Sequence, residues 1–291
     1  MKGTKVKRLV LDASGIRGTS RSAFEACKGQ YELLAIEDLF VELYTHCEKG
    51  ESFSKEQASM EAHKYFTNAA SLPILRPHDP VRFEVEEGRS ARECPHDKFR
   101  VPSEPFQPSD VDLAHMRVRE GFLGTFWDYR HPPECGAAFH DGRRLQSDKE
   151  LWPHMTESLN NDGTINLVRE NAVACFMEMG GYRGWTVSNS FCPDRQWLTF
   201  GAILAWFGYI RWKQARHGDN IPQRASPANP SYDMVHVAHM AICDGLLSTD
   251  PTMLNIAWAC WPEKRDGLMT YDHSRKAIVP YEPSWQKSSI S

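Results

Sequence analysis

The sequence predicts an α/β protein in which helices flank a parallel sheet. Short apolar stretches typical of buried strands alternate with longer helical stretches over residues 1–75, and strands and helices also follow one another over residues 195–291. This alternation indicates a parallel sheet, because parallel strands need a crossover connection that is usually a helix. We therefore predict one discontinuous domain made of 1–75 and 195–291. Residues 76–194 form a large, mainly helical or irregular insertion packed on or beside it.

The first half of this domain contains three predicted strands and three predicted helices. Each strand is a short apolar run, and Ser54 with Gln57 forms a capping-box pattern at the start of the third helix. The strands are 7–12, 32–36 and 72–75, and the helices are 20–30, 38–47 and 54–70. The order strand, helix, strand, helix, helix, strand supports the parallel arrangement.

The later elements are one strand and several helices. Gly180 and Gly181 are expected to end one helix, and Asp194 is expected to cap the next. The predicted helices are 111–126, 164–179, 194–217, 232–242 and 251–259, and the strand is 245–248.

Composition and charge favour a globular protein without a membrane segment. Of the 291 residues, 41% are hydrophobic and 25% charged, and no apolar run approaches the 18 residues of a membrane span. The apolar run after the basic N-terminus is too short for a signal peptide, so we expect a cytoplasmic location. The eight cysteines are scattered without a CxxC motif, which favours free thiols.

The net charge of −4 argues against a protein that coats nucleic acid without specificity. Basic residues nevertheless gather in two groups that neighbour the acids discussed below. Solvated side chains and a phosphate-binding surface explain these groups about equally well. The groups are Lys2, Lys5, Lys7, Arg8, Arg17, Arg21 and Lys28, and Arg211, Lys213, Arg216 and Arg224.

Three aspartates stand where α/β proteins collect ligands. Asp12 ends the first strand, and Asp250 follows the strand 245–248. The carboxyl ends of neighbouring parallel strands meet at one edge of the sheet, where ligands bind. Asp233 lies in the first turn of the helix before that later strand, so we expect it near the same edge.

Glu42 is the predicted fourth acid. At 100° per residue, the apolar face of its helix includes Leu39 and Leu43, and Glu42 falls on the shoulder of that face. A carboxylate there can reach a cleft without being fully enclosed. Asp38, four residues earlier on the same side, is the reserve candidate.

Four converging carboxylates repel one another unless a cation joins them. Mg²⁺ and Mn²⁺ prefer oxygen ligands. Such an ion can activate a water molecule and stabilise the charge of a phosphodiester. The acids therefore predict a metal-dependent hydrolase.

The segments that carry these acids resemble the PIN-domain family of metal-dependent ribonucleases. Leu9 to Ser14 resembles the family's opening, an apolar strand that ends in Asp-x-Ser or Asp-x-Asn. Residues 33–43 resemble its second strand and the helix that carries a catalytic Glu. Asp233 opens a helix 17 residues before Asp250, and this resembles the late motif, in which the next strand ends in Thr-x-Asp or Thr-Asp.

The resemblance implies a PIN-like nuclease fold, Mg²⁺ or Mn²⁺ as cofactor, and RNA as substrate. By position it assigns metal-ligand and catalytic roles to four acids and helper roles to two hydroxyl side chains: Asp12, Glu42, Asp233 and Asp250, and Ser14 and Thr249. It covers roughly residues 5–75 and 195–275, and the middle of the chain matches nothing in the family. Related proteins act as toxins, in defence or in RNA processing. An inhibitor or regulatory protein partner and a homo-oligomer are therefore left open.

Other motifs in the sequence allow alternative interpretations. The run from Asp12 echoes the nucleophile loop of haloacid-dehalogenase phosphatases, but Ser14 stands where that chemistry needs a second Asp. A non-catalytic partner-binding protein with a degenerate nuclease fold is a further alternative. His236 and His239 follow Asp233 at three-residue steps that wander around the helix, so we predict packed or solvent-facing side chains there. Two Cys and His pairs, Cys94 with His96 and Cys135 with His140, are predicted to be loop residues rather than zinc ligands.

Overall fold

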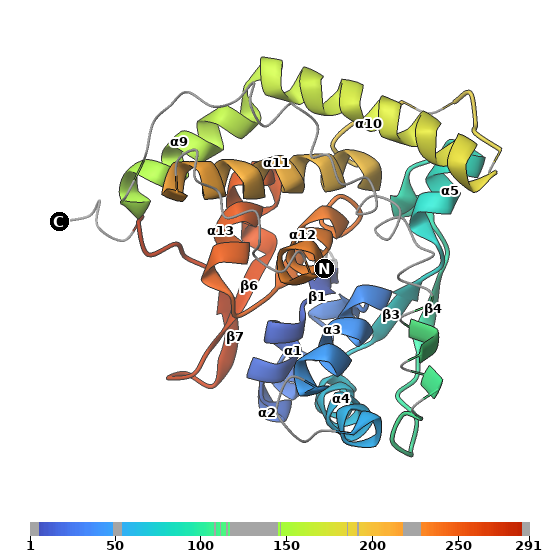
Figure 1. Ribbon diagram of the computed structural model, residues 1–291. Helices are drawn as coiled ribbons and strands as arrows, with labels where there is room; N and C mark the ends of the chain where they lie inside the picture. The colour runs from blue at the N-terminus through green and yellow to red at the C-terminus, as the bar shows by residue number, and fades with distance from the viewer. Residues whose placement is uncertain are drawn as a thin grey trace, which may run out of the picture.

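A seven-stranded sheet forms the centre of the computed structural model (Figure 1), in the order β4-β3-β2-β1-β5-β6-β7. The structure describes residues 6–48, 54–107, 147–184, 186–190, 192–217 and 228–286, with isolated positions 109, 110, 112–114, 116 and 145. The strands are β1 (Lys7–Leu11), β2 (Tyr31–Leu34), β3 (Ile74–Pro77), β4 (His96–Phe99), β5 (Gly245–Leu247), β6 (Leu268–Asp272) and β7 (Ala277–Pro280). Strands β3, β2, β1, β5 and β6 are parallel, whereas β4 and β7 pair antiparallel at the two edges.

The direction of winding reverses at β1. From β1 the chain moves outward through β2 and β3, and it later returns to the other side of β1 as β5 and β6. Leu9 pairs with Leu33 on β2 and with Gly245 on β5. The carboxyl ends of β1 and β5 are therefore neighbours at the point where open α/β sheets bind ligands.

The central strand is apolar along its inner length because helices cover both of its faces. Leu9, Val10 and Leu11 are each 0% exposed. A continuous apolar run of this kind is typical of a parallel strand buried on both sides. The first polar residue after this run is Asp12, which is also buried.

Helices surround the sheet and form two groups at opposite ends of the molecule (Figure 1). Helices α9, α10 and α11 lie at one end, and α1, α2 and α4 lie at the other. Helix α12 packs between them, against α11, α3 and β1. The helices are α1 (Ala13–Gly18), α2 (Arg21–Ala26), α3 (Glu37–Glu48), α4 (Lys55–Ala69), α5 (Pro80–Glu87), α9 (Asp148–Asn160), α10 (Asp162–Arg183), α11 (Leu198–His217), α12 (Ala228–His239) and α13 (Pro251–Cys260), with short 3₁₀ turns η1 (Ala91–Glu93) and η2 (Pro262–Gly267).

The α/β class and most predicted elements are confirmed. Strands β1, β2, β3 and β5 and helices α3, α4 and α13 lie within a few residues of their predicted bounds. The capping box also forms: Ser54 accepts a bond from the N–H of Gln57, and the Gln57 side chain accepts one from the N–H of Ser54. Local patterns were sufficient here because each element carries its own start signal or apolar run.

The expectation of a wholly parallel sheet is wrong at both edges. Strand β4 lies within the predicted insertion, yet it pairs with β3 and extends the sheet. Three of its four residues are exposed, so it lacks the apolar run that marks a buried strand. The hairpin of β6 and β7 was not predicted either. Edge strands are held by backbone pairing to a neighbour, which a local hydrophobic pattern does not reveal.

Several predicted helix ends are also wrong. Helix α2 ends at Ala26 rather than at 30. Helix α12 begins at Ala228 rather than at 232, so Asp233 lies in its second turn and not in its first. Helix α10 continues through Gly180 and Gly181 to Arg183 and is followed by Gly184, whose φ of +65° suits a left-handed cap. Glycine inside a helix costs about 1 kcal/mol, which tertiary packing can offset. Helix α11 begins at Leu198 rather than at 194. Of the predicted helix 111–126, only residues 112–114 and 116 are described, and they are helical.

Buried Glu84 fixes the observed start of α11. Its carboxylate accepts bonds from the N–H groups of Leu198 and Thr199, at 2.5 and 3.2 Å, and from the Thr199 hydroxyl at 2.9 Å. These N–H groups have no partner within the helix. The cap comes from α5, over a hundred residues earlier in the chain, so the sequence around α11 could not reveal it.

Candidate functional site

Asp12 lies directly after β1 and caps helix α1. Its side chain is 1% exposed, and Oδ2 accepts bonds from the N–H groups of Ser14 (3.0 Å) and Gly15 (3.4 Å). The hydroxyls of Ser14 and Ser248 donate to the same oxygen, the latter at 2.9 Å. Helix α1 approaches β5 closely, because a Cβ on Gly15 would lie 2.3 Å from the carbonyl oxygen of Leu247. These four hydrogen bonds orient the carboxylate through one of its two oxygens.

Hydroxyl groups join the ends of β1 and β5. The Ser14 hydroxyl accepts a bond from the N–H of Thr249 at 2.9 Å, and the Thr249 hydroxyl donates to the Ser14 carbonyl at 3.1 Å. Ser248 Oγ, which contacts Asp12, also accepts a bond from the N–H of Asp250 at 3.0 Å. The predicted helpers Ser14 and Thr249 therefore tie the two strand ends together. Ser248 has the same role, although the sequence reasoning did not name it.

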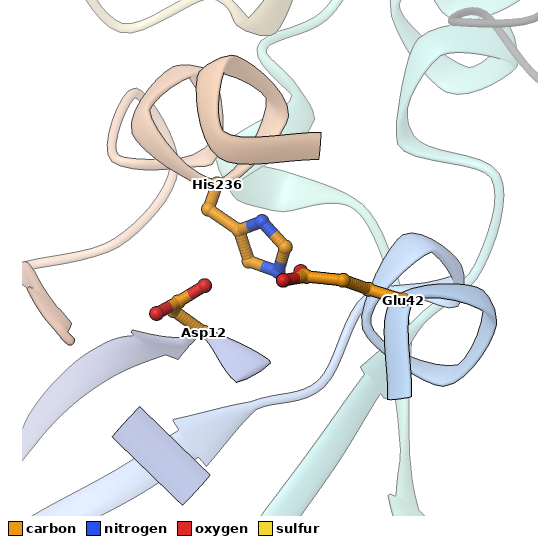
Figure 2. A group of neighbouring side chains, drawn as sticks. All are labelled: Asp12, Glu42 and His236. Carbon is orange, nitrogen blue, oxygen red and sulfur yellow. The ribbon is translucent and has the colours of Figure 1, made fainter. Parts of the chain in front are cut away.

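Glu42 and His236 face Asp12 from two different helices (Figure 2). One potential ligand atom from each of the three residues lies within 4.8 Å of those from the other two. Glu42 comes from α3 and His236 from α12, so three elements distant in sequence converge at the carboxyl end of β1. These three residues could hold a metal ion, and we call this candidate group, Asp12, Glu42 and His236, the metal triad.

Burial and neighbouring negative charge act together on Glu42. Burial raises the pKa of Glu42 to about 9, helped by the charges of Asp12 and Asp233, whereas Arg17 opposes the shift. Its Oε2 is buried and accepts no hydrogen bond among the residues the structure describes. A cation bound beside this carboxylate would stabilise its charged form and offset the cost of burying it among other negative charges.

Asp233 shares this acidic environment without joining the metal triad. Burial raises the pKa of Asp233 to about 7, and the charges of Asp12 and Asp250 add to the effect. Asp233 is therefore close enough to the triad to interact with it electrostatically. The reserve candidate Asp38 is buried, and desolvation raises the pKa of its carboxyl to about 7 as well. It too lies outside the triad.

Asp250 lies at the expected strand end but acts as a helix cap. Its Oδ1 accepts bonds from the N–H groups of Thr252 (2.7 Å) and Met253 (3.2 Å) at the start of α13. The four predicted acids therefore share one end of the sheet, but only two of them, Asp12 and Glu42, belong to the metal triad. Asp233 and Asp250 form an outer acidic pair beside it.

His236 is the residue that sequence reasoning missed. We expected both histidines of α12 to be packed or solvent-facing, and His239 does pack: it is buried, and its Nδ1 contacts the Val235 carbonyl at 2.8 Å. His236 is also buried, but a nitrogen of its ring lies close to the carboxylates of Asp12 and Glu42, which makes it the third member of the triad. The available signal was its spacing of three from Asp233, because residues three apart are neighbours on a helix surface.

The members of the two predicted basic groups that the structure describes are not all gathered around the triad. Arg17 lies close enough to Glu42 for its charge to oppose the rise in the Glu42 pKa. Lys7, in contrast, lies at the other end of β1, where it pairs with Asp266 at 2.9 Å. Arg211 is buried. Lys2, Lys5 and Arg224 lie outside the described residues.

A cavity of about 510 Å³ opens at the amino ends of the parallel strands, away from the triad. Its lining carries both signs of charge, and most of its cations are paired with acids in the same wall. Arg92 contacts Asp244 at 3.4 Å, and Arg195 contacts Glu263 at 3.2 Å. Its charged side chains already have partners, so the cavity offers no unsatisfied charge to a ligand. The lining residues are Lys7, Arg92, Arg195, Gln196, Asp244, Glu263, Lys264 and Asp266.

In the first predicted Cys and His pair, His96 begins strand β4, so the expectation of a loop residue is wrong there. Cys94 is buried, whereas His96 is exposed and its Nε2 lies 3.1 Å from a guanidinium nitrogen of Arg8. Cys135 and His140 lie outside the described residues.

Comparison with known proteins found no match to any protein-family model, curated protein or solved structure. In the part of the chain that the structure describes, no helix has both the length and the apolar character that crossing a membrane requires. The geometry of the site is therefore the basis for a functional proposal.

Proposed function

We propose that this protein is a metal-dependent endoribonuclease with a PIN-like fold, and that it hydrolyses RNA phosphodiester bonds. The observation that carries the proposal is the metal triad at the carboxyl end of β1, within 4.8 Å atom to atom. The order of acidic motifs along the chain, which resembles that of PIN-domain ribonucleases, supports the choice of substrate. Magnesium or manganese is the cofactor that the resemblance implies.

The triad fits a divalent ion in size and in chemistry. Three ligand atoms 4.8 Å apart from one another would each lie about 2.8 Å from a common centre, whereas a metal–ligand bond is about 2.1 Å long. Ligand atoms within 4.8 Å of one another therefore need only a small inward shift. Carboxylate oxygens and imidazole are both common metal ligands. Glu42 Oε2 is buried without a hydrogen bond among the described residues. A bound ion would stabilise this oxygen most, because it would supply the missing partner.

A bound divalent ion would neutralise a phosphodiester oxygen and lower the pKa of the attacking water molecule. The chain's own contribution is to hold the ligands in place. Ser14 and Ser248 orient Asp12 through Oδ2. Asp233 and Asp250 add negative charge beside the triad, which strengthens attraction for a cation. Arg17, whose charge reaches Glu42, is a candidate contact for a backbone phosphate.

The test is cleavage of labelled RNA by the full chain, with Mg²⁺ or Mn²⁺ and with EDTA. Cleavage should require the added metal. In Asp12→Asn it should fall by more than the roughly 10- to 100-fold typical of losing an outer partner of a metal ligand. Asp266→Asn, at the opposite end of the sheet, is the matched control and should cleave normally.

Two outcomes would overturn the proposal. One is cleavage that survives EDTA, and the other is an Asp12→Asn variant as active as its control. A phosphate covalently bound to Asp12 would instead support the phosphatase alternative. RNA that remains intact under every metal condition would support the partner-binding alternative.

A further inference from the structure

His236 changes the chemistry of the site from all-oxygen to mixed nitrogen and oxygen. Two of the triad's ligand groups are carboxylates, and the third is an imidazole that is 0% exposed. We infer that the site binds a first-row transition metal, such as Mn²⁺, Co²⁺ or Zn²⁺, in preference to Mg²⁺, with His236 as the selecting ligand. This inference rests on the metal site of the proposed function and narrows its cofactor.

The position of His236 is fixed by the packing of its helix. Helix α12 contacts α11, α3 and β1, and its neighbouring residues Met234, Val235 and Val237 are at most 3% exposed. A helix held on several sides cannot rotate to remove one side chain from the site. The imidazole therefore faces the two carboxylates as part of the fold (Figure 2).

Ligand chemistry then separates the ions. Imidazole suits zinc, iron, nickel and copper, and manganese also accepts carboxylates well. Magnesium demands near-ideal octahedral oxygen geometry and gives up its water reluctantly. A buried imidazole would have to replace one of those oxygens. The affinity order should therefore rise from Mg²⁺ through Mn²⁺ to Co²⁺ and Zn²⁺.

A different role for His236 uses the same geometry. A protonated imidazolium could balance the two carboxylates with no ion present, as in a buried charge network. The two roles differ in one observable, because a metal ligand places its nitrogen in the coordination sphere. An imidazolium that only balances charge is repelled by an added cation.

The experiment measures ion binding by the full chain, not cleavage. Titration calorimetry with Mg²⁺ and Mn²⁺ gives the affinity ratio, and pulsed EPR of the Mn²⁺-loaded chain detects a directly bound nitrogen. The wild type should prefer Mn²⁺ by at least about tenfold and should show nitrogen coupling. In His236→Gln the preference should fall by about tenfold and the coupling should disappear.

His273→Gln is the matched control, because His273 is exposed and lies outside the triad. It should keep both the preference and the nitrogen signal. The EPR measurement on the wild type needs no variant, so the inference stays testable even if His236→Gln folds poorly.

The possible failures are distinguishable. Mn²⁺ bound without nitrogen coupling, or with no advantage over Mg²⁺, overturns the inference and leaves the nuclease proposal standing. Nitrogen-coupled Mn²⁺ in a chain that does not cleave RNA supports the inference and removes the proposed function. No binding of any divalent ion overturns both and leaves the imidazolium role.

Discussion

Charged side chains are arranged differently at the two ends of the central strands, with opposite charges paired at the amino ends and like charges close together at the carboxyl ends. At the amino ends, charged groups meet partners of the opposite sign: Lys7 with Asp266, and Arg92 with Asp244. Lys264, above the Trp261 ring, donates hydrogen bonds to three carbonyls. Each of these groups has a structural partner, so this end needs no ligand.

At the carboxyl ends the same sheet brings like charges together. Glu42 and Asp233 both have raised pKa values, and negative neighbours contribute in each case. A fold selected for stability alone would not need this arrangement, because buried like charges cost free energy. Strongly perturbed acids around a common point are typical of functional sites. The difference between the two ends is therefore the best physical pointer to where this protein acts.

Removing Lys264 should have the largest effect on stability, because this end is held by satisfied polar groups. Lys264→Met keeps most of the side-chain volume but leaves the carbonyls of Met240, Ala241 and Cys243 without their donor. We expect a loss of about 3 kcal/mol, which corresponds to a fall in Tm of roughly 6–12 °C. Calorimetry measures it. Mn²⁺ affinity should stay unchanged, and a parallel loss of metal binding would contradict the separation of the two ends.

Neutralising Glu42 should raise the stability of the metal-free protein, whereas removing Lys264 should lower it. Its pKa is about 9 in the folded protein and about 4.3 when unfolded. The folded state therefore binds more protons between these values, and the stability from this group, complete below about pH 4.3, is lost as the pH rises toward 9. Metal-free Glu42→Gln at pH 8 should be more stable than wild type by about 2 kcal/mol.

Chemical denaturation with EDTA, at pH 5 and pH 8, measures this effect. The difference between the variant and the wild type should be larger at pH 8. Added Mn²⁺ should reverse the order, because only the wild type keeps the carboxylate ligand. A Glu42→Gln variant that is less stable than wild type at pH 8 without metal would show that the carboxyl end carries no electrostatic cost.

Ser248 offers the smallest and most selective change. Ser248→Ala removes one of the hydroxyls that orient Asp12 while leaving every triad ligand in place. Mn²⁺ affinity should fall by about tenfold, as when an outer partner of a ligand is lost. Titration calorimetry measures it, with Ser274→Ala on the exposed turn of the β6–β7 hairpin as control. Equal affinity in both variants would mean that Ser14 and the backbone N–H groups orient Asp12 without Ser248.

Much of the fold could be predicted because its signals are local. Leu9 to Leu11 form a buried strand because an uninterrupted apolar run needs cover on both faces. The start of α4 follows from two residues three apart. The edge strand β4 and the true start of α11 could not be predicted this way. One depends on pairing with β3 and the other on a cap from Glu84.

The sequence by itself determined that acidic residues would stand at the ends of two strands and at one helix shoulder, since an apolar run that ends in Asp places a carboxylate at the rim of the sheet. Only the tertiary structure decided which of them meet. Asp250 caps α13, whereas His236 lies beside Asp12 and Glu42. The physical reason is that these three side chains come within metal-binding distance only if α12 has the right rotation against α3 and β1. Packing between segments some two hundred residues apart sets that rotation.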